Sequence, residues 1–411
     1  MTFWFFNPFY VIGQEQAIRV LSLQTYRHNK RASASAKPDD FDEENDYDDF
    51  RPTRKIDQKK HKALDESIPE KSNILLLGPT GSGKTLITKR LAMATGVPFS
   101  ISDATSLTQA GYVGEDVDSV ISKLLTAADG DVQQAERGIV FIDEIDKIAA
   151  RSGPNGMGRD VGGEGVQQAL LKMLEGTEVE CTWKNPANNK KQQVVIDTAN
   201  ILFVLSGAFS GIEKIVAMRR DERKIGFGKK DEADKSVAGK AGVSMNDEKR
   251  EVWDVTVEDM KAFGMIPEFI GRISCIVCLH ELNSEDLVRV LTEPKNSLVQ
   301  QYQWYFEQDK TKLSFTECGL KAIAEKAYNN QTGARGLRAI VEKITQESAL
   351  DAANAFSEHK PIGKIVIDEG VVNGETKPKY EKTERRGRKS KRDTYNEYLL
   401  DAPEDHPKLP K

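Results

Sequence analysis

Long apolar runs, a cysteine-rich disulfide pattern and a strong net charge are all missing from this sequence of 411 residues. No stretch approaches the roughly 18 consecutive apolar residues of a membrane-spanning helix, so no membrane association is expected. The four cysteines do not suggest a disulfide framework, which fits a reducing, intracellular compartment. The net charge of −5 gives no support to nucleic-acid binding, so no nucleic-acid partner is expected either.

The amino terminus lacks the marks of a targeting segment. Residues 1–10 are rich in aromatic side chains, but they have neither the basic flank and cleavage site of a signal peptide nor the Arg- and Ser-rich composition of a transit peptide. Targeting therefore cannot be read from this segment.

What the sequence does contain is a glycine-rich stretch directly after a short apolar run. Residues 74–77 are expected to form a buried strand, and residues 78–85 form a complete G-x-x-x-x-G-K-T phosphate loop from which a helix should start at Lys84. The glycines let successive backbone N–H groups turn inward around phosphates, Lys84 supplies a positive charge, and the Thr85 hydroxyl can ligate Mg²⁺. The candidate nucleotide-binding residues of this stretch are Gly78, Pro79, Thr80, Gly81, Ser82, Gly83, Lys84, Thr85 and Leu86.

A second apolar strand, residues 138–142, ends in two carboxylates about 60 residues after the phosphate loop. An ATPase needs one acid at a strand tip to hold the magnesium shell and a second acid beside it to polarise the attacking water. Asp143 is assigned the first role and Glu144 the second. Together with the phosphate loop, this pair predicts hydrolysis of ATP rather than binding alone.

Further apolar segments complete an α/β pattern. Strands are expected at 99–101, 201–205 and 273–279, and residues 117–128 have the spacing of an amphipathic helix. Ser206 ends one of these strands and could touch the γ-phosphate or the attacking water. The expected fold is a parallel-sheet P-loop NTPase large domain followed by a small, mostly helical domain.

Composition sets the expected domain boundaries. Residues 39–49 are strongly acidic and are followed by a basic stretch, a composition that cannot bury enough apolar surface to fold. The expected parts are 1–30, an N-terminal segment of the large domain; 31–70, an acidic and basic disordered insertion; 71–282, the large domain; 283–375, the small domain; and 376–411, a disordered polar tail.

Two further motifs allow more than one interpretation. Cys275 and Cys278, with His280 nearby, could suggest zinc or redox chemistry, but a zinc site needs a second pair and residues three apart on a strand point to opposite faces. Small apolar side chains in a sheet are the favoured interpretation.

The polar segment from Met218 to Trp253 is expected to be a loop, and it contains one apolar island, Ile225-Gly226-Phe227. This island is either a docking plug or part of a loop held by one packed Phe.

In this order, the phosphate loop, the acidic pair, Gly111-Tyr112-Val113-Gly114, Gly226-Phe227-Gly228, residues 267–272 (PEFIGR) and residues 333–336 (GARG) resemble the ClpX family of AAA+ unfoldases. The resemblance covers about Tyr10 to Gly374, outside the acidic insertion. It implies an AAA+ module that assembles as a homo-hexamer and acts on unfolded or tagged protein substrates. With ATP and Mg²⁺ it unfolds those that are folded, and it delivers the chains to a ClpP-type peptidase. It also implies roles for single residues: Val11 and Ile12 on the adenine side, Ser206 as sensor 1, Arg272 as an arginine finger for the next subunit, Arg335 as sensor 2, Tyr112, Val113 and Arg159 in the substrate pore, and Ile225, Gly226 and Phe227 in peptidase docking.

The sequence departs from the family pattern in places. The four-cysteine zinc domain that usually precedes the module is not found, so delivery by adaptors is not implied, and the basic Arg-Lys-His pore-entry loop is replaced by residues 188–191 (NNKK). The acidic insertion and the basic tail are not family features. They favour a member housed in the mitochondrial matrix or another organelle, with a bacterial-type cytoplasm as the alternative.

Other functions stay open at this point. A protease-independent AAA+ remodelling chaperone differs only in whether Ile225-Gly226-Phe227 binds a partner. HslU, a sister unfoldase, carries a large inserted domain, whereas only some 40 residues separate Leu86 from Asp129 here. A nucleic-acid motor would need a basic stripe in the folded part, which the sequence lacks.

Overall fold

The computed structural model describes residues 11–35, 69–108, 115–149, 163–184, 191–226 and 255–382. The chain divides into two compact units. The large unit comprises residues 1–295 and 330–335, and the small unit comprises residues 296–329 and 336–411. Within the described ranges, no helix is long and apolar enough to cross a membrane.

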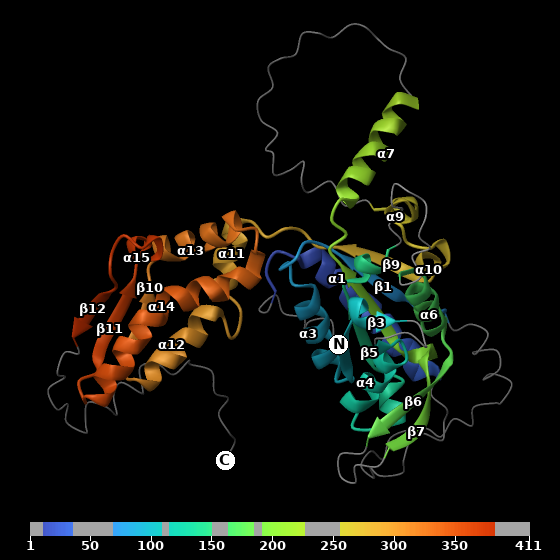
Figure 1. Ribbon diagram of the computed structural model, residues 1–411, viewed down its shortest axis with the longest axis horizontal. Coiled ribbons are helices and arrows are strands. Elements are labelled where there is room, and N and C mark those ends of the chain that lie inside the picture. Colours follow the sequence, from blue (N-terminus) through green and yellow to red (C-terminus); the bar gives the residue numbers. More distant parts are fainter. Residues whose placement is uncertain are drawn as a thin grey trace, which may run out of the picture. The chain divides into compact units, whose positions relative to one another are not determined.

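The large unit is built on a five-stranded sheet in the order β2-β5-β8-β1-β9 (Figure 1). All neighbouring strands are parallel, so their carboxyl ends lie along one edge of the sheet. This arrangement confirms the predicted α/β class. The strands are β1 (Asn73–Leu77), β2 (Phe99–Asp103), β5 (Ile139–Asp143), β8 (Leu202–Gly207) and β9 (Ile273–Cys278).

Helices cover both faces of this sheet because its central strands are apolar on both sides. On β1, Ile74 and Leu76 pack in one buried cluster with α1 and α3, whereas Leu75 and Leu77 pack in another with α4 and α6. Successive strand residues point to opposite faces, so a continuous apolar run such as β1 supports two helical layers. These helices are α1 (Glu15–Ser35), α3 (Lys84–Thr95), α4 (Ser119–Ala127) and α6 (Gly163–Glu175).

Helix boundaries agree with the sequence analysis at the phosphate loop and differ elsewhere. Helix α3 begins at Lys84, as predicted, and ends at Thr95, where it is capped by Gly96, whose φ of 68° is left-handed. Helix α6 begins at Gly163, so the loop expected over residues 159–165 gives way to helix for its last three residues. Helix α1 continues to Ser35, five residues into the stretch expected to be a disordered insertion.

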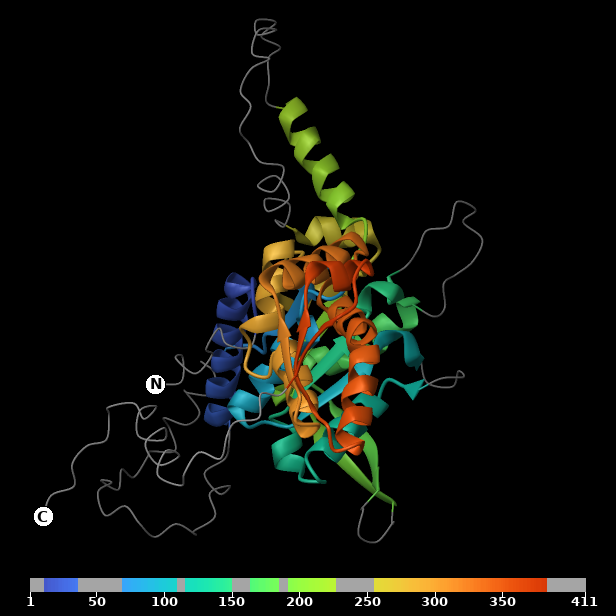
Figure 2. The same cartoon turned by 90° about the vertical axis from the view of Figure 1, so that its left-hand side faces the viewer.

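The largest correction concerns α7, which runs from Ile212 to Gly226, where a loop was expected from Met218 onward. Ile212 and Val216 are buried on one side of this helix, and Arg219 forms an ion pair at 3.0 Å with the buried Asp259. These contacts support the helix although its sequence is highly charged. Helix α7 extends away from the rest of its unit (Figures 1 and 2).

Short elements complete the large unit. Helix α11 starts with a capping box between Asn283 and Asp286. Strands β6 and β7 pair as an antiparallel hairpin, and β3 pairs with β4. The bounds are β3 (Leu107–Thr108), β4 (Glu115–Asp116), α5 (Val132–Ala135), β6 (Glu178–Lys184), β7 (Lys191–Asp197), α9 (Val257–Phe263), α10 (Pro267–Gly271), α11 (Ser284–Thr292) and the 3₁₀ helices η3 (Ala104–Ser106), η4 (Ile145–Ile148) and η5 (Thr198–Asn200).

The small unit consists of helices and a three-stranded sheet in the order β10-β11-β12. The sequence analysis did not predict this sheet, and β12 lies within the segment assigned to the disordered tail. Its elements are α12 (Leu298–Gln308), β10 (Lys312–Phe315), α13 (Glu317–Asn329), α14 (Gly333–Ser357), β11 (Ile362–Ile367), α15 (Glu369–Asn373) and β12 (Lys379–Lys382); the first three residues of α14 group with the large unit.

Candidate nucleotide site

The phosphate loop leaves β1 at the carboxyl edge of the sheet, and its glycines are required by its shape. Gly81 and Gly83 have φ values of 84° and 99°, in the left-handed region that favours glycine. A Cβ on Gly78 would lie 2.8 Å from the carbonyl oxygen of Leu279, and one on Gly81 would lie 3.0 Å from that of Thr332. The loop therefore has no room for side chains at these positions, and its backbone can approach a ligand closely.

Lys84 is held against this loop. Its ammonium donates to the carbonyl oxygens of Gly78 at 2.7 Å and Pro79 at 2.9 Å. Because α3 begins at Lys84, unpaired N–H groups and the positive end of the helix dipole face the same place. This combination favours an anion such as a phosphate group.

The charge of Lys84 depends on its neighbours. Burial lowers the pKa of Lys84, and the carboxylates of Asp143 and Asp146 raise it in part. Arg335 lowers it further, since residues 330–335 lie with the large unit. The predicted sensor Arg335 is thus close enough to influence the phosphate-loop lysine electrostatically.

The two predicted catalytic acids lie where β5 ends at the same edge of the sheet: Asp143 is its last residue and Glu144 follows it. The carboxylate of Asp143 accepts a hydrogen bond from the N–H of Glu144 at 3.0 Å. Glu144 has a left-handed backbone with a φ of 56°, which is unusual for a residue with a side chain, and it is exposed. This turn places the two carboxylates in different surroundings. Asp143 lies at the strand tip, whereas Glu144 is exposed to solvent.

Ser206 lies on β8, between β5 and β1, and pairs in register with Leu76. It has no exposed surface, and its hydroxyl has no hydrogen-bond partner among the described residues. The N–H of Gly78 donates to the carbonyl of Gly207 at 3.3 Å, which joins the phosphate loop to this strand tip. A buried hydroxyl without a partner at this edge fits a polar ligand or its water.

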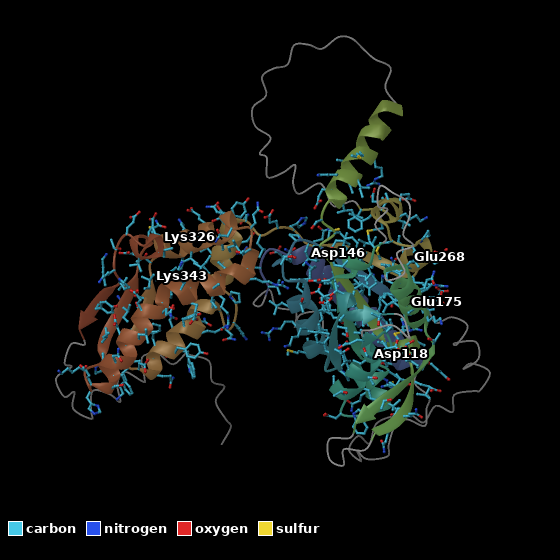
Figure 3. All side chains as sticks on the ribbon, in the orientation of Figure 1. Asp118, Asp146, Glu175, Glu268, Lys326 and Lys343 are labelled. Atoms are coloured by element: carbon cyan, nitrogen blue, oxygen red, sulfur yellow. The ribbon has the colours of Figure 1, made fainter. Side chains whose placement is uncertain are left out.

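Sequence reasoning missed Asp146, three residues after Asp143. Asp146 is 5% exposed and accepts a hydrogen bond from the N–H of Ala208 at 3.2 Å. A Cβ on Gly207 would lie 2.7 Å from its carboxylate oxygen. Asp146, labelled in Figure 3, therefore ties the segment after Glu144 to the end of β8. Its signal in the sequence is a third acid close behind the expected pair.

Val11 and Ile12, predicted to lie on the adenine side, are buried in the large unit. A Cβ on Gly83 would lie 3.9 Å from Val11, so this segment does approach the phosphate loop. Gln14 closes the same predicted segment, and its side chain donates to the carbonyl of His280 at 2.8 Å and accepts from its N–H at 3.1 Å. Gln14 thus fixes the segment that carries Val11 and Ile12 to the chain leaving β9.

The structure does not bring Arg272 to this site. Arg272 precedes β9, and its neighbour Ile273 pairs with Asn73, the first residue of β1, whereas the phosphate loop follows the last. The guanidinium of Arg272 instead pairs with Glu175 at 2.8 Å. The predicted arginine finger therefore lies at the opposite edge of the sheet from its own nucleotide site.

Several predicted residues cannot be placed. Tyr112, Val113, Arg159 and Phe227 lie outside the described residues. Ile225 and Gly226 are the last two residues of α7, and the position of the Ile225 side chain is not described. The pore and docking roles stay predictions.

The residues present fit a nucleoside triphosphate. The glycine loop, the helix terminus and Lys84 match a chain of phosphates, and the hydroxyl of Thr85 and the carboxylate of Asp143 are the oxygen donors that Mg²⁺ prefers. Thr85 and Asp143 stay the predicted metal ligands.

This strand order, with a phosphate loop after β1, acids after β5 and a polar tip on β8, defines a P-loop ATPase of the AAA class. Residues 69–276 match the AAA domain (Cdc48 subfamily), and residues 282–364 match the C-terminal, D2-small domain, of ClpB protein. The chain is also 44% identical over 375 residues to the ATP-dependent Clp protease ATP-binding subunit ClpX of Treponema denticola, an alignment that covers 90% of this chain and 80% of that protein. The chain belongs to the ClpX family of AAA+ ATPases.

Proposed function

We propose that this ATPase assembles as a homo-hexameric ring and pulls tagged or unfolded protein substrates through the ring pore. Pulling unfolds the substrates that are still folded, and the ring delivers the extended chains to a ClpP-type peptidase. The name of the Treponema denticola relative, the ATP-binding subunit of an ATP-dependent protease, supports this proposal.

The position of Arg272 is the main observation that supports assembly into a ring. Its strand starts in register with the first residue of the five-residue strand β1, so Arg272 lies roughly 16 Å along the sheet from its own phosphate loop. An arginine that stabilises the charge of phosphoryl transfer must reach the γ-phosphate. Arg272 can do so only in the site of a neighbouring subunit, and closed rings arise from such head-to-tail contacts.

The chemistry of one site follows from its own residues. The backbone of the phosphate loop and Lys84 bind and orient the phosphates, and Mg²⁺, held by Thr85 and Asp143, would neutralise their developing charge. Glu144 is open to solvent at the strand tip, where its carboxylate can orient a water and accept its proton. Ser206 supplies a hydroxyl that can contact the same water or the γ-phosphate.

Tyr112 and Val113, with Arg159, are proposed to contact the substrate in the pore. Tyr112 and Val113 stand between β3 and β4 in the sequence, and the flanking Leu107 and Val117 are buried in the core of the large unit. Leu107 and Val117 share this buried cluster with Leu75 and Leu77 of β1, so the residues on both sides of the predicted pore segment pack against the sheet that carries the nucleotide site. An aromatic residue repeated around the ring can push on an extended chain without reading its sequence.

Ile225-Gly226-Phe227 is proposed to dock the ring onto the peptidase. Helix α7, whose last two residues are Ile225 and Gly226, extends away from the rest of its unit (Figure 1). Burying Ile225 and Phe227 in a partner pocket is worth roughly 1.5–3 kcal/mol each. Repetition on one ring face strengthens such a contact through effective concentration.

The test is degradation of a stable tagged reporter protein by the full chain, ATP and a ClpP-type peptidase. Phe227→Ser is expected to abolish degradation and co-sedimentation with the peptidase, while ATP hydrolysis and unfolding continue. Met218→Ser, which removes a 66% exposed side chain on α7, is the matched control, and the variant should degrade the reporter normally.

The alternatives give different results. Degradation that persists in Phe227→Ser contradicts the docking role. Loss of unfolding in the same variant shows that Phe227 packs within its own subunit. If the unaltered chain unfolds the reporter but a ClpP-type peptidase does not degrade it, the result supports a protease-independent remodelling chaperone.

A further inference from the structure

Helix α6 carries a buried glutamine that joins two parts of the catalytic machinery. Gln167 has no exposed surface. Its side-chain N–H donates to the carbonyl of Ile148 at 2.8 Å, and its side-chain carbonyl accepts from the N–H of Ile266 at 2.9 Å. Both ends of one amide are thus bonded to backbone groups 19 and 99 residues away in the chain.

The first of these segments begins at the catalytic acid. Glu144 precedes η4, and the N–H of Lys147 donates to the carbonyl of Glu144 at 2.9 Å. Ile145 and Ile148 are buried in this turn. The carbonyl that Gln167 binds therefore terminates a compact turn whose other end is Glu144.

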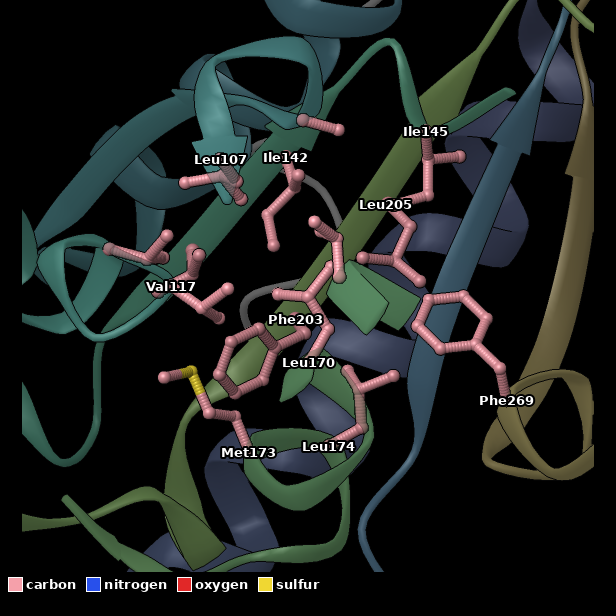
Figure 4. Close-up of a cluster of buried hydrophobic side chains, with 14 of the residues drawn as sticks. Leu107, Val117, Ile142, Ile145, Leu170, Met173, Leu174, Phe203, Leu205 and Phe269 are labelled. Carbon is pink, nitrogen blue, oxygen red and sulfur yellow. The ribbon is translucent and has the colours of Figure 1, made fainter. Parts of the chain in front are cut away.

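The second segment leads to Arg272. Ile266 caps α10, the N–H of Ile270 donates to the carbonyl of Ile266 at 3.2 Å, and the N–H of Arg272 donates to that of Phe269 at 3.2 Å. Phe269 is fully buried (Figure 4). A continuous series of backbone hydrogen bonds thus connects the N–H that Gln167 binds to Arg272.

The last turn of α6 holds the same arginine segment. The side-chain amide of Asn73 donates to the carbonyls of Leu174 at 3.1 Å and Arg272 at 2.9 Å. Leu170, Met173 and Leu174 lie with Phe203 of β8 in one buried cluster (Figure 4). Because the helix is packed along its length, we expect α6 to transmit displacements as a rigid element.

We propose that Gln167 is a positioning residue that couples the Glu144 turn of one subunit to the arginine which that subunit presents to its neighbour. A displacement of the Glu144 turn shifts Ile148, which moves Gln167 and Ile266, and through α10 it reaches Arg272. The state of one nucleotide site is thereby passed to the next site around the ring. This inference rests on the proposed action of Arg272 in a neighbouring subunit.

The test uses two full-length chains that each hydrolyse ATP much more slowly than the unaltered chain. One carries Arg272→Ala and the other carries Glu144→Gln, so a mixed ring contains sites with an intact Glu144 facing an intact Arg272. Gln167→Met is then added to the chain that donates Arg272, whose own acid is already disabled. The recovered turnover at saturating ATP should fall at least about tenfold, because a misplaced catalytic group costs rate even when binding is intact. Binding of a fluorescent ATP analogue and co-assembly should be unchanged.

Gln168→Met is the matched control, since Gln168 is the exposed neighbour on the same helix. It should leave the recovered turnover unaltered. If Gln167→Met does not fold, Gln167→Asn keeps the amide on a side chain too short to reach both partners, and the same fall is expected.

The outcomes separate this inference from the function on which it rests. No recovery in the parental mixture, despite co-assembly, contradicts the action of Arg272 in a neighbour and the coupling with it. Recovery that Gln167→Met leaves unchanged contradicts the coupling alone. A fall that is accompanied by loss of nucleotide binding or co-assembly also contradicts it, because Gln167 would then be only structural.

Discussion

The guanidinium of Arg272 and the carboxylate of Glu175 form an ion pair at 2.8 Å within one chain, at the edge of the sheet opposite the nucleotide site. The two side chains are 48% and 39% exposed. Pairs this exposed contribute only about 0–1 kcal/mol, so separating Arg272 from Glu175 costs little. The pair holds Arg272 in place without committing it to a structural role.

Glu175→Gln should therefore leave ATP hydrolysis at or above the level of the unaltered chain, whereas Arg272→Ala should reduce it at least about tenfold. The melting temperatures of both variants should stay near that of the parent, because the pair is exposed. Turnover and thermal unfolding of the two variants are the measurements. Equal losses of hydrolysis in both would show that the pair acts as one structural unit.

Glu144→Gln should bind ATP and still assemble, while turnover falls roughly 100-fold or more. The amide keeps the shape of the side chain but cannot accept a proton from water. Steady-state hydrolysis together with binding of a fluorescent ATP analogue checks this. Undiminished turnover would remove Glu144 from the mechanism.

Ser206→Ala should slow hydrolysis at least about tenfold while the protein becomes no less stable. Its buried hydroxyl has no partner among the described residues, so removing it breaks no described hydrogen bond and relieves a desolvation cost of about 1–3 kcal/mol. Ser100→Ala, at another buried hydroxyl of the same kind on β2, is the control and should change stability alike without slowing hydrolysis. Equal turnover in the two variants would argue against a role for Ser206.

His28 should make the large unit sensitive to acid. Burial and the nearby charges of Arg31 and Lys71 lower the pKa of His28 from 6.5 to about 4. Between these pH values the unfolded chain binds the proton more readily, so the free energy of unfolding falls as the pH drops from 6.5 towards 4, by about 3 kcal/mol at most. In His28→Leu, the melting temperature should change less between pH 7 and pH 5 than it does in the parent. The exposed His359→Asn should keep the slope of the parent, and an unchanged slope in His28→Leu would contradict this reasoning.

Motif chemistry made the nucleotide site predictable. The start of α3 at Lys84 and the strand end at Asp143 follow from residue types that phosphate and metal binding require. The end of α7 did not follow, because its helix depends on an ion pair between Arg219 and Asp259, 40 residues apart. Strands β10 to β12 are short and pair only with one another, so no local sequence pattern predicted them.

Gln167 illustrates the limit most clearly. It stands at helical spacing with Val166, Leu170 and Met173 on the apolar face of α6, so a polar residue in a core position was visible in the sequence. Its partners, Ile148 and Ile266, were not visible, because the fold alone brings these backbone groups together. Sequence patterns identify residues that chemistry requires, whereas residues that join distant segments need the structure.

The most direct test of the account follows the loss of structure in a stable tagged reporter protein, together with ATP hydrolysis, for the unaltered chain and for Tyr112→Ala. The account predicts that the unaltered chain unfolds the reporter only with hydrolysable ATP, and that Tyr112→Ala hydrolyses ATP at a similar rate without unfolding it. Unfolding by Tyr112→Ala at the parental rate, or hydrolysis by the unaltered chain that never unfolds the reporter, would contradict the claim that this ATPase pulls on proteins.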